Sequence, residues 1–277
     1  MIGAARSEAE RLFGRAVVGA TPLSGGCVGQ VVRLDLDDGR RIVAKQGPGL
    51  EAEAFMLGWL TRHTALPMPA LHLASDALIL MQFVATGGPF AAEDAADRLA
   101  ALHGHSSDHF GFERDTVIGG LPQPNRPTGQ WCQFFAEQRL VFMAGQAHAA
   151  GRLPAALLGR IEALAQRLPD WLDEPPAPAL VHGDAWGGNI LCRGGRVAAF
   201  IDPAIHYADA EVELAFGTLF GTFDDRFFAR YAEHRPLRPG FWERRDLLNL
   251  YPLLVHVRLF GGSYVDQVDR VVRRYVG

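Results

Sequence analysis

The residues best suited to chemistry are oxygen-bearing side chains between positions 182 and 203. In the segment His182-Gly-Asp-Ala-Trp-Gly-Gly-Asn189, Asn189 follows five residues after Asp184, and Asp202 ends an apolar run eighteen residues after Asp184. Transfer of a phosphoryl group from ATP to a hydroxyl needs a carboxylate that receives the hydroxyl proton, together with oxygen ligands for Mg²⁺. The spacing predicts Asp184 as the catalytic base, and Asn189 and Asp202 as metal ligands.

Protein kinases carry the same parts as H-R-D-x-x-x-x-N and D-F-G. Here Gly183 stands in place of the middle arginine, and Pro203-Ala204 stands in place of Phe-Gly. A His-Gly-Asp triplet alone is more often an ordinary loop, because Asp and Asn are common in turns. The spacing of the Asn and the second Asp, with apolar strands beside both, makes the pattern specific. We interpret His182 as a structural residue that braces the loop.

A glycine-rich segment in the first part of the chain supplies the nucleotide side. Residues 24–31, Ser-Gly-Gly-Cys-Val-Gly-Gln-Val, match the kinase loop G-x-G-x-x-G-x-V with Ser at the first glycine, and Lys45 follows fourteen residues later. Such a hairpin tip closes over a nucleotide with N–H groups facing phosphate oxygens, and the strand Lys adds positive charge. The loop residues predicted to bind the nucleotide are Gly25, Gly26, Cys27 and Gly29.

Three further positions follow from this assignment. Lys45 needs a carboxylate partner, and we favour Glu53. Glu51 is better explained by its place at the start of a helix, where a carboxylate contributes about 0.3–1 kcal/mol. Where a kinase connects its lobes, we expect the carbonyl of Gln82 and the N–H of Val84 to pair with the adenine edge. The alternatives for Cys27 are a small loop residue, which we prefer, and a redox-sensitive thiol.

The order of elements predicts an α+β, protein-kinase-like fold with two lobes. The N-lobe, residues 1–84, is expected to hold a small antiparallel sheet and one helix, and the C-lobe, residues 85–277, to be larger and mainly helical. Alternating residues on both sides of an Asp-Asp-Gly turn at 37–39 predict a hairpin. Periodicity predicts helices at 51–62, 91–105, 130–149, 154–172, 247–260 and 264–275, and strands at 31–36, 41–45, 78–84, 179–181 and 197–201.

Composition narrows the class of protein. The 277 residues carry a net charge of -4 without a run of Lys or Arg, so we expect neither nucleic acid nor an anionic membrane as partner. No stretch approaches 18 apolar residues, and the first residues are charged. The odd number of distant cysteines, three, argues against a disulfide framework. We expect a cytoplasmic protein and a monomer.

The segment from Asp209 to Ala215 opens a helix. The simplest interpretation makes Asp209 its N-cap and places Glu211 and Glu213 in the acidic first turn. We prefer that interpretation for Glu211.

The chain resembles the fructosamine kinase family, also called ketosamine 3-kinases, whose relatives include aminoglycoside phosphotransferases and choline kinases. The resemblance extends over nearly the whole length, and two blocks are more specific than a general kinase signature: the Trp186 motif and residues 118–125, Ile-Gly-Gly-Leu-Pro-Gln-Pro-Asn. The other matching segments are Gly25-Gly-Cys27, Phe110-Gly-Phe112, Ile201-Asp-Pro-Ala204, Asp209 to Ala215, Leu219-Phe-Gly221 and Leu259-Phe-Gly-Gly-Ser-Tyr264.

The resemblance implies ATP- and Mg²⁺-dependent phosphorylation of the sugar 3-hydroxyl of ketosamines, in which a ribulosamine, erythrulosamine or fructosamine is carried by a small amine or a protein. The phosphoester is unstable and frees the amine. The resemblance further implies that Asp184 is the base, that Asn189 and Asp202 bind metal, and that Trp186 lines the sugar pocket. An indole suits the C–H face of a sugar.

Two departures from the family pattern remove no catalytic group, but they bear on fine positioning and on substrate preference. Ala208 replaces a usual Gly, and Glu213 replaces a usual Asp that is expected to brace the catalytic loop, residues 182–189. Two alternatives to the ketosamine kinase stay open. One is a phosphotransferase for an aminoglycoside or amino alcohol, which Trp186 and the 118–125 block disfavour. The other is a non-catalytic nucleotide-binding protein, which the intact set of charged residues disfavours.

Overall fold

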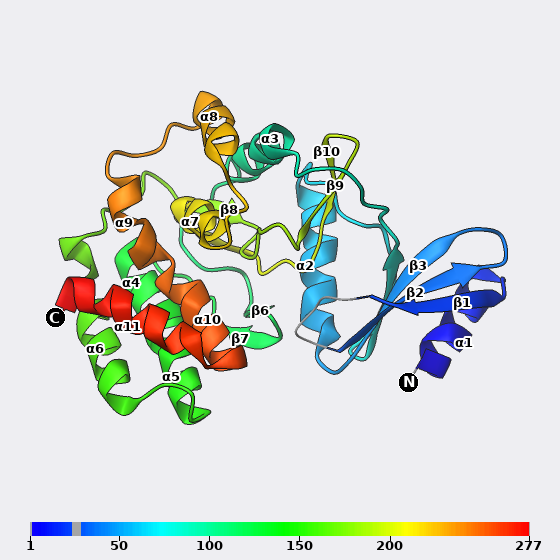
Figure 1. Ribbon diagram of the computed structural model, residues 1–277, viewed down its shortest axis with the longest axis horizontal. Coiled ribbons are helices and arrows are strands. Elements are labelled where there is room, and N and C mark those ends of the chain that lie inside the picture. Colours follow the sequence, from blue (N-terminus) through cyan, green and yellow to red (C-terminus); the bar gives the residue numbers. More distant parts are fainter. Residues whose placement is uncertain (1, 24–28, 277) are drawn as a thin grey trace.

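A computed structural model describes residues 2–23 and 29–276 (Figure 1). Gly25, Gly26 and Cys27, which were predicted to bind the nucleotide, lie outside the described residues. A β-sheet with two helices forms one end of the molecule, and a larger group of helices forms the other. The N-terminal segment lies with the sheet, and the C-terminal helix lies at the opposite end (Figure 1). The α+β prediction is confirmed.

The sheet has five strands in the order β1-β2-β3-β5-β4, and all neighbours are antiparallel. The predicted hairpin at residues 31–45 is β2 and β3, joined through the turn at Gly39, whose φ of 85° suits a residue without a Cβ. Every second residue of β2 is buried, as expected for a strand with one face on a core. The strands are β1 Val17–Pro22, β2 Gln30–Leu36, β3 Arg41–Gln46, β4 Leu71–Ala74 and β5 Leu78–Gln82.

Each face of this sheet packs on its own helix. Helix α2, Leu50–His63, covers the face that includes Val43 and Ile79. Helix α1, Ile2–Phe13, covers the face that includes Leu34. The sequence predicts one helix in this lobe, so α1 is an addition. Its polar sequence hides the contact, because its buried residues in this core are only the small Ala5 and Ala9, with Phe13 partly buried beside them.

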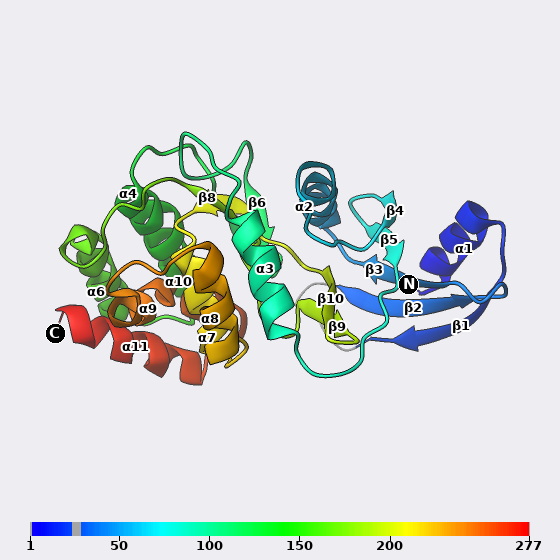
Figure 2. The ribbon, with the colours of Figure 1, turned by 90° about the horizontal axis from the view of Figure 1, so that it is seen from above.

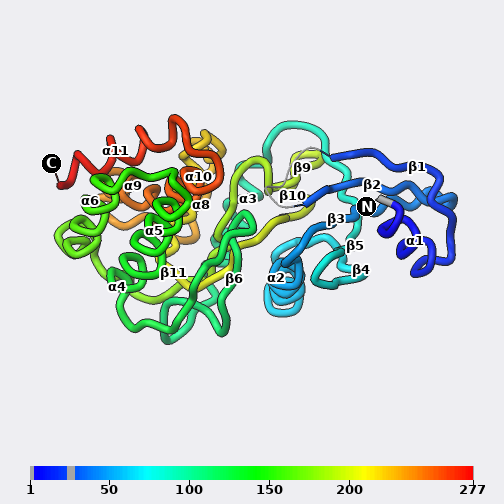
Figure 3. Tube along the Cα trace, turned by 90° about the horizontal axis from the view of Figure 1, so that it is seen from below, coloured from blue at the N-terminus to red at the C-terminus, as the bar shows by residue number. Residues whose placement is uncertain are grey.

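The rest of the chain is mainly helical, as predicted. The predicted helix at 130–149 is a continuous helical segment whose centre, η1, is a π-helix. In Figure 3, α11 runs along α10 and near α6, and both contacts are present in the structure. The helices are α3 Ala92–Leu102, α4 Trp131–Phe135, η1 Ala136–Val141, α5 Phe142–Ala149, α6 Ala155–Ala165, η2 Leu168–Asp170, α7 Glu211–Leu219, α8 Asp225–His234, α9 Phe241–Leu248, α10 Leu250–Phe260 and α11 Ser263–Val276.

Three short antiparallel pairs stand between the sheet and these helices and carry the loops of interest. Strand β8 leads into His182, β9 follows Asn189, and β10 leads to Asp202. Ala208, the departure from the family's Gly, is buried in β11 opposite Ala179. The pairs are β6 Thr116–Ile118 with β7 Leu121–Gln123, β8 Ala179–Val181 with β11 His206–Ala208, and β9 Ile190–Arg193 with β10 Arg196–Phe200.

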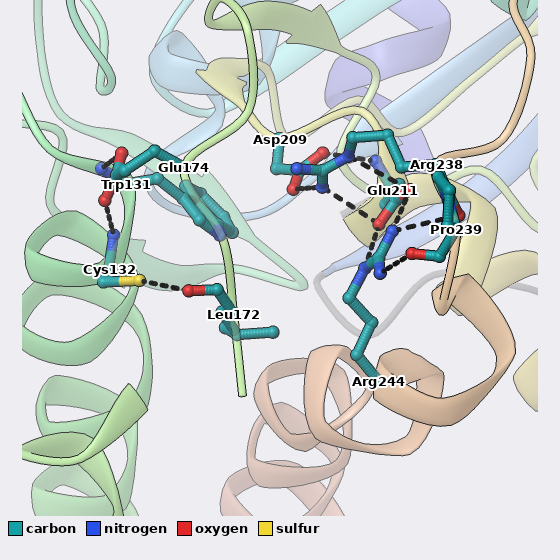
Figure 4. A network of polar contacts seen from close by, with 9 residues as sticks. All are labelled: Trp131, Cys132, Leu172, Glu174, Asp209, Glu211, Arg238, Pro239 and Arg244. Atoms are coloured by element: carbon teal, nitrogen blue, oxygen red, sulfur yellow. Dashed lines mark hydrogen bonds and ion pairs between the residues drawn. The ribbon is translucent and has the colours of Figure 1, made fainter. Parts of the chain in front are cut away.

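Two separate groups of polar contacts hold segments of this helical part together (Figure 4). Glu174 accepts hydrogen bonds from the N–H groups of Trp131 and Cys132 at 2.6 and 3.1 Å, and so satisfies two free donors at the start of α4. Glu211 receives two hydrogen bonds of 2.6 Å from Arg244. Arg238 bridges Glu211 and Asp209.

The predicted place of Glu211 in an acidic first turn is confirmed, but this place alone does not account for its side chain. Glu211 does begin α7, but its side chain is buried and its partners are two arginines from the region of α9. A buried carboxylate needs such partners because desolvation outweighs a helix dipole. The N-cap of α7 is Ala210, one residue after the predicted Asp209, and Asp209 accepts a hydrogen bond from Glu211 N at 3.0 Å.

Leu34→Ala is expected to lower the free energy of unfolding by about 2–5 kcal/mol, because it leaves a cavity in a fully buried site between α1 and the sheet. The measurement is urea unfolding followed by circular dichroism. The control is Leu12→Ala in α1, the same chemical change at a side chain that is 39% exposed, with an expected change within about 0.5 kcal/mol. Equal losses in both variants would contradict this core assignment.

Candidate active site

The loop after β8 is held in contact with the loop after Asp202. The N–H of Ala204 donates to the carbonyl of His182 at 2.7 Å. Gly183 has φ of 84°, and a Cβ there would lie 2.2 Å from the carbonyl oxygen of Ala204. Only glycine fits this approach without moving the backbone, which explains why Gly183 stands where protein kinases have arginine.

Glu213 supports the same loop through hydrogen bonds to its backbone. Its carboxylate accepts hydrogen bonds from the N–H groups of His182 and Gly183 at 3.0 and 2.7 Å. His103 Nε2 lies 3.0 Å from the same carboxylate, and His103 Nδ1 lies 2.7 Å from the hydroxyl of Tyr231. Burial acts to raise the pKa of Glu213, but the contacts with His103 and His182 lower it overall. Glu213, although one methylene longer than the usual Asp, therefore braces the loop as expected for this position.

Asp184 and Asn189 lie side by side at the end of the loop. The amide nitrogen of Asn189 donates to the carbonyl of Asp184 at 2.9 Å and to its Oδ2 at 2.8 Å. Among the described residues, no group donates to the amide oxygen of Asn189, which is therefore available to another partner. Burial raises the pKa of Asp184 well above its ordinary value, and the nearby charge of Asp202 raises it further. A carboxyl with a raised pKa is a stronger proton acceptor once it is ionised.

Asp202 has an unusual backbone. It is the one non-glycine residue with positive φ, 51°, in the described part of the chain. Such a conformation is disfavoured for residues with a Cβ and persists where the surroundings impose it, often at functional sites. Here it carries the side chain towards β3, and Asp202 Oδ1 lies 3.1 Å from Lys45 Nζ.

Lys45 is buried between two carboxylates. Its Nζ lies 2.6 Å from Glu53 Oε2, and Glu53 is itself buried on α2. Burial acts to lower the pKa of Lys45, but the charges of Asp202 and Glu53 raise it overall, so the ammonium stays protonated. The partner favoured from the sequence is the one present, whereas Glu51 is exposed. Figure 2 shows α2 between the sheet and the helical part of the molecule.

These side chains share one cavity of roughly 300 Å³. The predicted residues along its wall are Lys45, Glu53, Asp184, Trp186, Asn189 and Asp202. Gly29, Gln82 and Val84 are not part of this wall. Gly29 has φ of 78° and packs on the carbonyl of Gln46, while the side chain of Gln82 accepts a hydrogen bond from Ala70 N at 3.3 Å. The structure therefore brings the residues predicted for catalysis and metal binding into one cavity, and the predicted adenine contacts are not among the residues that line it.

An aromatic surface forms another part of the cavity wall, and the sequence predicts only its first member. Trp186 is 38% exposed, and its ring lies 5.7 Å from that of Phe220, which in turn lies 5.2 Å from His256. His256 contacts Phe260 and Tyr264 at 5.8 and 4.8 Å. The available signals were the segments Leu219-Phe-Gly221 and Leu259 to Tyr264, which match the family but suggest no role.

Comparison with known proteins identifies the family of this chain. The family model for fructosamine kinase matches residues 4–277. The chain belongs to the fructosamine kinase family. This family consists of phosphotransferases, so the predicted enzyme class is confirmed.

Individual relatives of this fructosamine kinase family member are similar over most of their length. A probable ketoamine kinase of Synechocystis is 35% identical over 268 residues, which cover 91% of this chain and 88% of the relative. A chloroplastic protein-ribulosamine 3-kinase of Arabidopsis thaliana is 29% identical, covering 92% of this chain and 81% of the relative. A Thermobifida fusca crystal structure assigned as a fructosamine-3-kinase has a TM-score of 0.87 at 33% identity, covering 99% and 98% of the two chains.

A more distant structure shares the fold. An aminoglycoside phosphotransferase in complex with AMP-PNP and hygromycin B has a TM-score of 0.68 at 19% identity, with 99% of each chain covered. In the described part of this fructosamine kinase family member, no helix has the length and apolar character needed to cross a membrane.

Glu213→Gln is expected to lower the free energy of unfolding by about 1–3 kcal/mol. The amide NH₂ cannot accept the hydrogen bond that one carboxylate oxygen now accepts, so a buried backbone N–H of His182 or Gly183 loses its partner. The measurement is equilibrium unfolding in urea. Glu243→Gln, the same change at an exposed site, should stay within about 0.5 kcal/mol. A Glu213→Gln protein as stable as this control would refute the brace.

Proposed function

We propose that the protein is an ATP- and Mg²⁺-dependent kinase that phosphorylates the 3-hydroxyl of the sugar in ketosamines. The observation that carries the proposal is that Asp184, Asn189 and Asp202 share one cavity with Trp186 and with the buried Lys45–Glu53 pair. The chain's family membership supports the same reaction. The phosphorylated product is unstable and releases the amine, so the proposed activity reverses glycation.

In this proposal Asp184 receives the proton of the attacking hydroxyl. The hydroxyl oxygen forms a bond to the γ-phosphorus, the bond between that phosphorus and the bridging oxygen of ADP breaks, and the proton passes to the carboxylate. The hydrogen bond from Asn189 fixes the direction in which Asp184 points. Little push from the base is required for a loose transition state, so positioning accounts for most of the contribution of this residue.

The donor atoms at Asn189 and Asp202 fit Mg²⁺. They are hard oxygen ligands, and Mg²⁺ commonly takes one or two protein ligands and completes its shell with phosphates and water. The amide of Asn189 already points its nitrogen at Asp184, which leaves the oxygen for a cation. When bound, Mg²⁺ neutralises charge on the transferring phosphates.

The nucleotide is proposed to lie on the N-lobe side of the cavity. Lys45 would contact phosphate oxygens while Glu53 holds it in place. The backbone of the glycine-rich loop would cover the phosphates. In the same proposal, the adenine edge pairs with the carbonyl of Gln82 and the N–H of Val84. The remaining loop residues assigned to the nucleotide are Gly25, Gly26, Cys27 and Gly29.

The charges along the cavity favour an acceptor that carries an amine. Three carboxylates line the wall, and the ammonium of Lys45 already pairs with two of them. The nitrogen of a ketosamine is a secondary amine that can be protonated, and a cation is attracted to aromatic faces such as those of Trp186 and Phe220. An aminoglycoside or amino alcohol would also carry an amine. The mainly apolar aromatic wall suits one cationic group with a sugar better than a polycation.

The remaining assignments are part of the same proposal. We place the division between lobes at residues 84 and 85, in the segment between the end of β5 and the start of α3. We propose a cytoplasmic monomer whose acceptor is a ribulosamine, erythrulosamine or fructosamine, free or carried by a protein. Steady-state kinetics over ketosamines of four to six sugar carbons would rank these acceptors.

Asp184→Asn is expected to lower kcat for a ketosamine by about 10²–10⁴-fold, because the amide cannot receive the proton. Binding of Mg-ATP, measured by calorimetry, should persist in this variant. ADP release coupled to a ketosamine is the assay. Undiminished turnover would remove Asp184 from the role of base.

Trp186→Ala is expected to raise KM for the ketosamine about tenfold and to leave KM for ATP within about twofold, since the indole is assigned to the acceptor alone. Trp186→Phe should fall between the wild type and Trp186→Ala. Both constants come from initial rates with one substrate varied at a time. A parallel rise in KM for ATP would place the indole elsewhere in the site.

A further inference from the structure

The β6–β7 hairpin forms part of the cavity wall. Val117, Ile118, Gly119 and Gly120 line the same cavity as Asp184 and Asp202. In Figure 1 the hairpin lies in the middle of the molecule, between α10 and α2, and β6 packs on α2. This is the start of the 118–125 block, which marks the family in the sequence but has no role in the reaction described so far.

The tip of the hairpin presents backbone donors. Gly119 and Gly120 form a two-residue turn with φ of 54° and 76°, the sign at both positions that a type I′ turn requires. Within the described residues, neither N–H group donates to another part of the chain. Two unpaired donors therefore stand at the wall of a cavity that also holds the proposed base.

Buried side chains hold this hairpin against the loop after Asp202. Gln123 donates to the carbonyl of Ala204 at 2.9 Å and to Thr116 Oγ1 at 2.8 Å. The hydroxyl of Tyr251 on α10 donates to Gln123 Oε1 at 2.8 Å. Since Ala204 follows Asp202 by two residues and also contacts the catalytic loop, these bonds tie the tip to the reacting groups.

A buried arginine completes the support. Arg139, on the π-helix η1, donates to Asn125 Oδ1 and to the carbonyl of Pro124, both at 2.6 Å. Asn125 in turn donates to Thr116 Oγ1 at 2.7 Å. The hydrogen bonds from Arg139 go to uncharged acceptors, and its guanidinium packs over the ring of Phe134. Burying an arginine without a carboxylate partner costs free energy. In this protein the buried Arg139 holds the base of the hairpin in place.

We propose that the tip of the β6–β7 hairpin binds the acceptor sugar, with the N–H groups of Gly119 and Gly120 donating to its oxygens. The inference rests on the proposed function and adds the element that recognises the sugar. A sugar carries several oxygens, and the affinity of the protein for the sugar falls if these oxygens are buried without hydrogen-bond partners. Apart from the reacting groups, the cavity wall is mostly apolar, and His256 Nδ1 already contacts the carbonyl of Pro252 at 2.7 Å. The backbone donors of the tip meet that need.

The chain offers a matched control for a test by mutation. The β9–β10 hairpin has the same kind of tip, Gly194-Gly195, with φ of 59° and 77°. Its residues do not line the cavity, and a Cβ on Gly195 would have no atom within 4 Å. A substitution at Gly120 and the same substitution at Gly195 therefore impose similar backbone strain, but only the first lies at the cavity.

The test compares Gly120→Asn with Gly195→Asn, because Asn tolerates positive φ better than other residues with a side chain. The expected result is a rise in KM for fructosyl-glycine of about tenfold or more in Gly120→Asn, because the added side chain stands at the tip where the sugar would approach the N–H groups. KM for ATP should stay within about twofold of the wild type. Gly195→Asn should keep both constants within about twofold of the wild type. An unchanged ketosamine KM in Gly120→Asn, with an active wild type, would overturn the inference and leave the proposed function intact.

A second measurement does not depend on how a variant folds. Wild-type protein labelled with ¹⁵N-glycine is titrated with a ketosamine that lacks the 3-hydroxyl, and the amide signals of Gly119 and Gly120 are followed. We expect both signals to shift while those of Gly194 and Gly195 stay. Stationary Gly119 and Gly120 signals at saturation would overturn the inference. A wild type that neither binds nor phosphorylates any ketosamine would overturn the proposed function and this inference together.

Discussion

The ammonium group of Lys45 is buried, and a buried charge is tolerated only with close partners. Its two partners come from different parts of the molecule: Glu53 from α2, and Asp202 from the loop after β10. To satisfy this one charge, β3, α2 and that loop must keep fixed relative positions. The left-handed backbone of Asp202 is tolerated as part of this arrangement. The two ion pairs of Lys45 therefore fix the nucleotide side of the cavity relative to the acceptor side.

A second set of contacts fixes the catalytic loop to the same frame. Glu213 holds two of its N–H groups, and the close approach of Gly183 to Ala204 joins it to the loop that carries Asp202. Gln123 donates to that same carbonyl of Ala204. The carbonyl of Ala204 thus lies against Gly183 of the catalytic loop and also accepts a hydrogen bond from Gln123 of the β6–β7 hairpin. Buried hydrogen bonds of this kind restrict the motion of the groups that they join, and fixed positions are what catalysis by positioning requires.

Much of this site could be predicted from local sequence. The hairpin of β2 and β3, the loop from Asp184 to Asn189 and the approach to Asp202 depend on residues close together in the chain, where turn preferences and alternation are strong signals. The choice of Glu53 over Glu51 also needed only the spacing from a strand lysine to a helix. The helix α1 was missed because its fully buried residues are two alanines, which give a weak apolar pattern.

The sequence by itself determined the fold class, the family and the residues suited to phosphoryl transfer, because each depends on residue types at short, regular spacings. Only the tertiary structure decided which distant groups meet. An acidic first turn looks the same whether its carboxylates face water or arginines, so the partners of Glu211 could not be predicted. The aromatic wall from Trp186 to Tyr264 and the glycine tip at Gly119 likewise come together through packing between segments far apart in sequence. Periodicity within one element carries no information about the element it packs against.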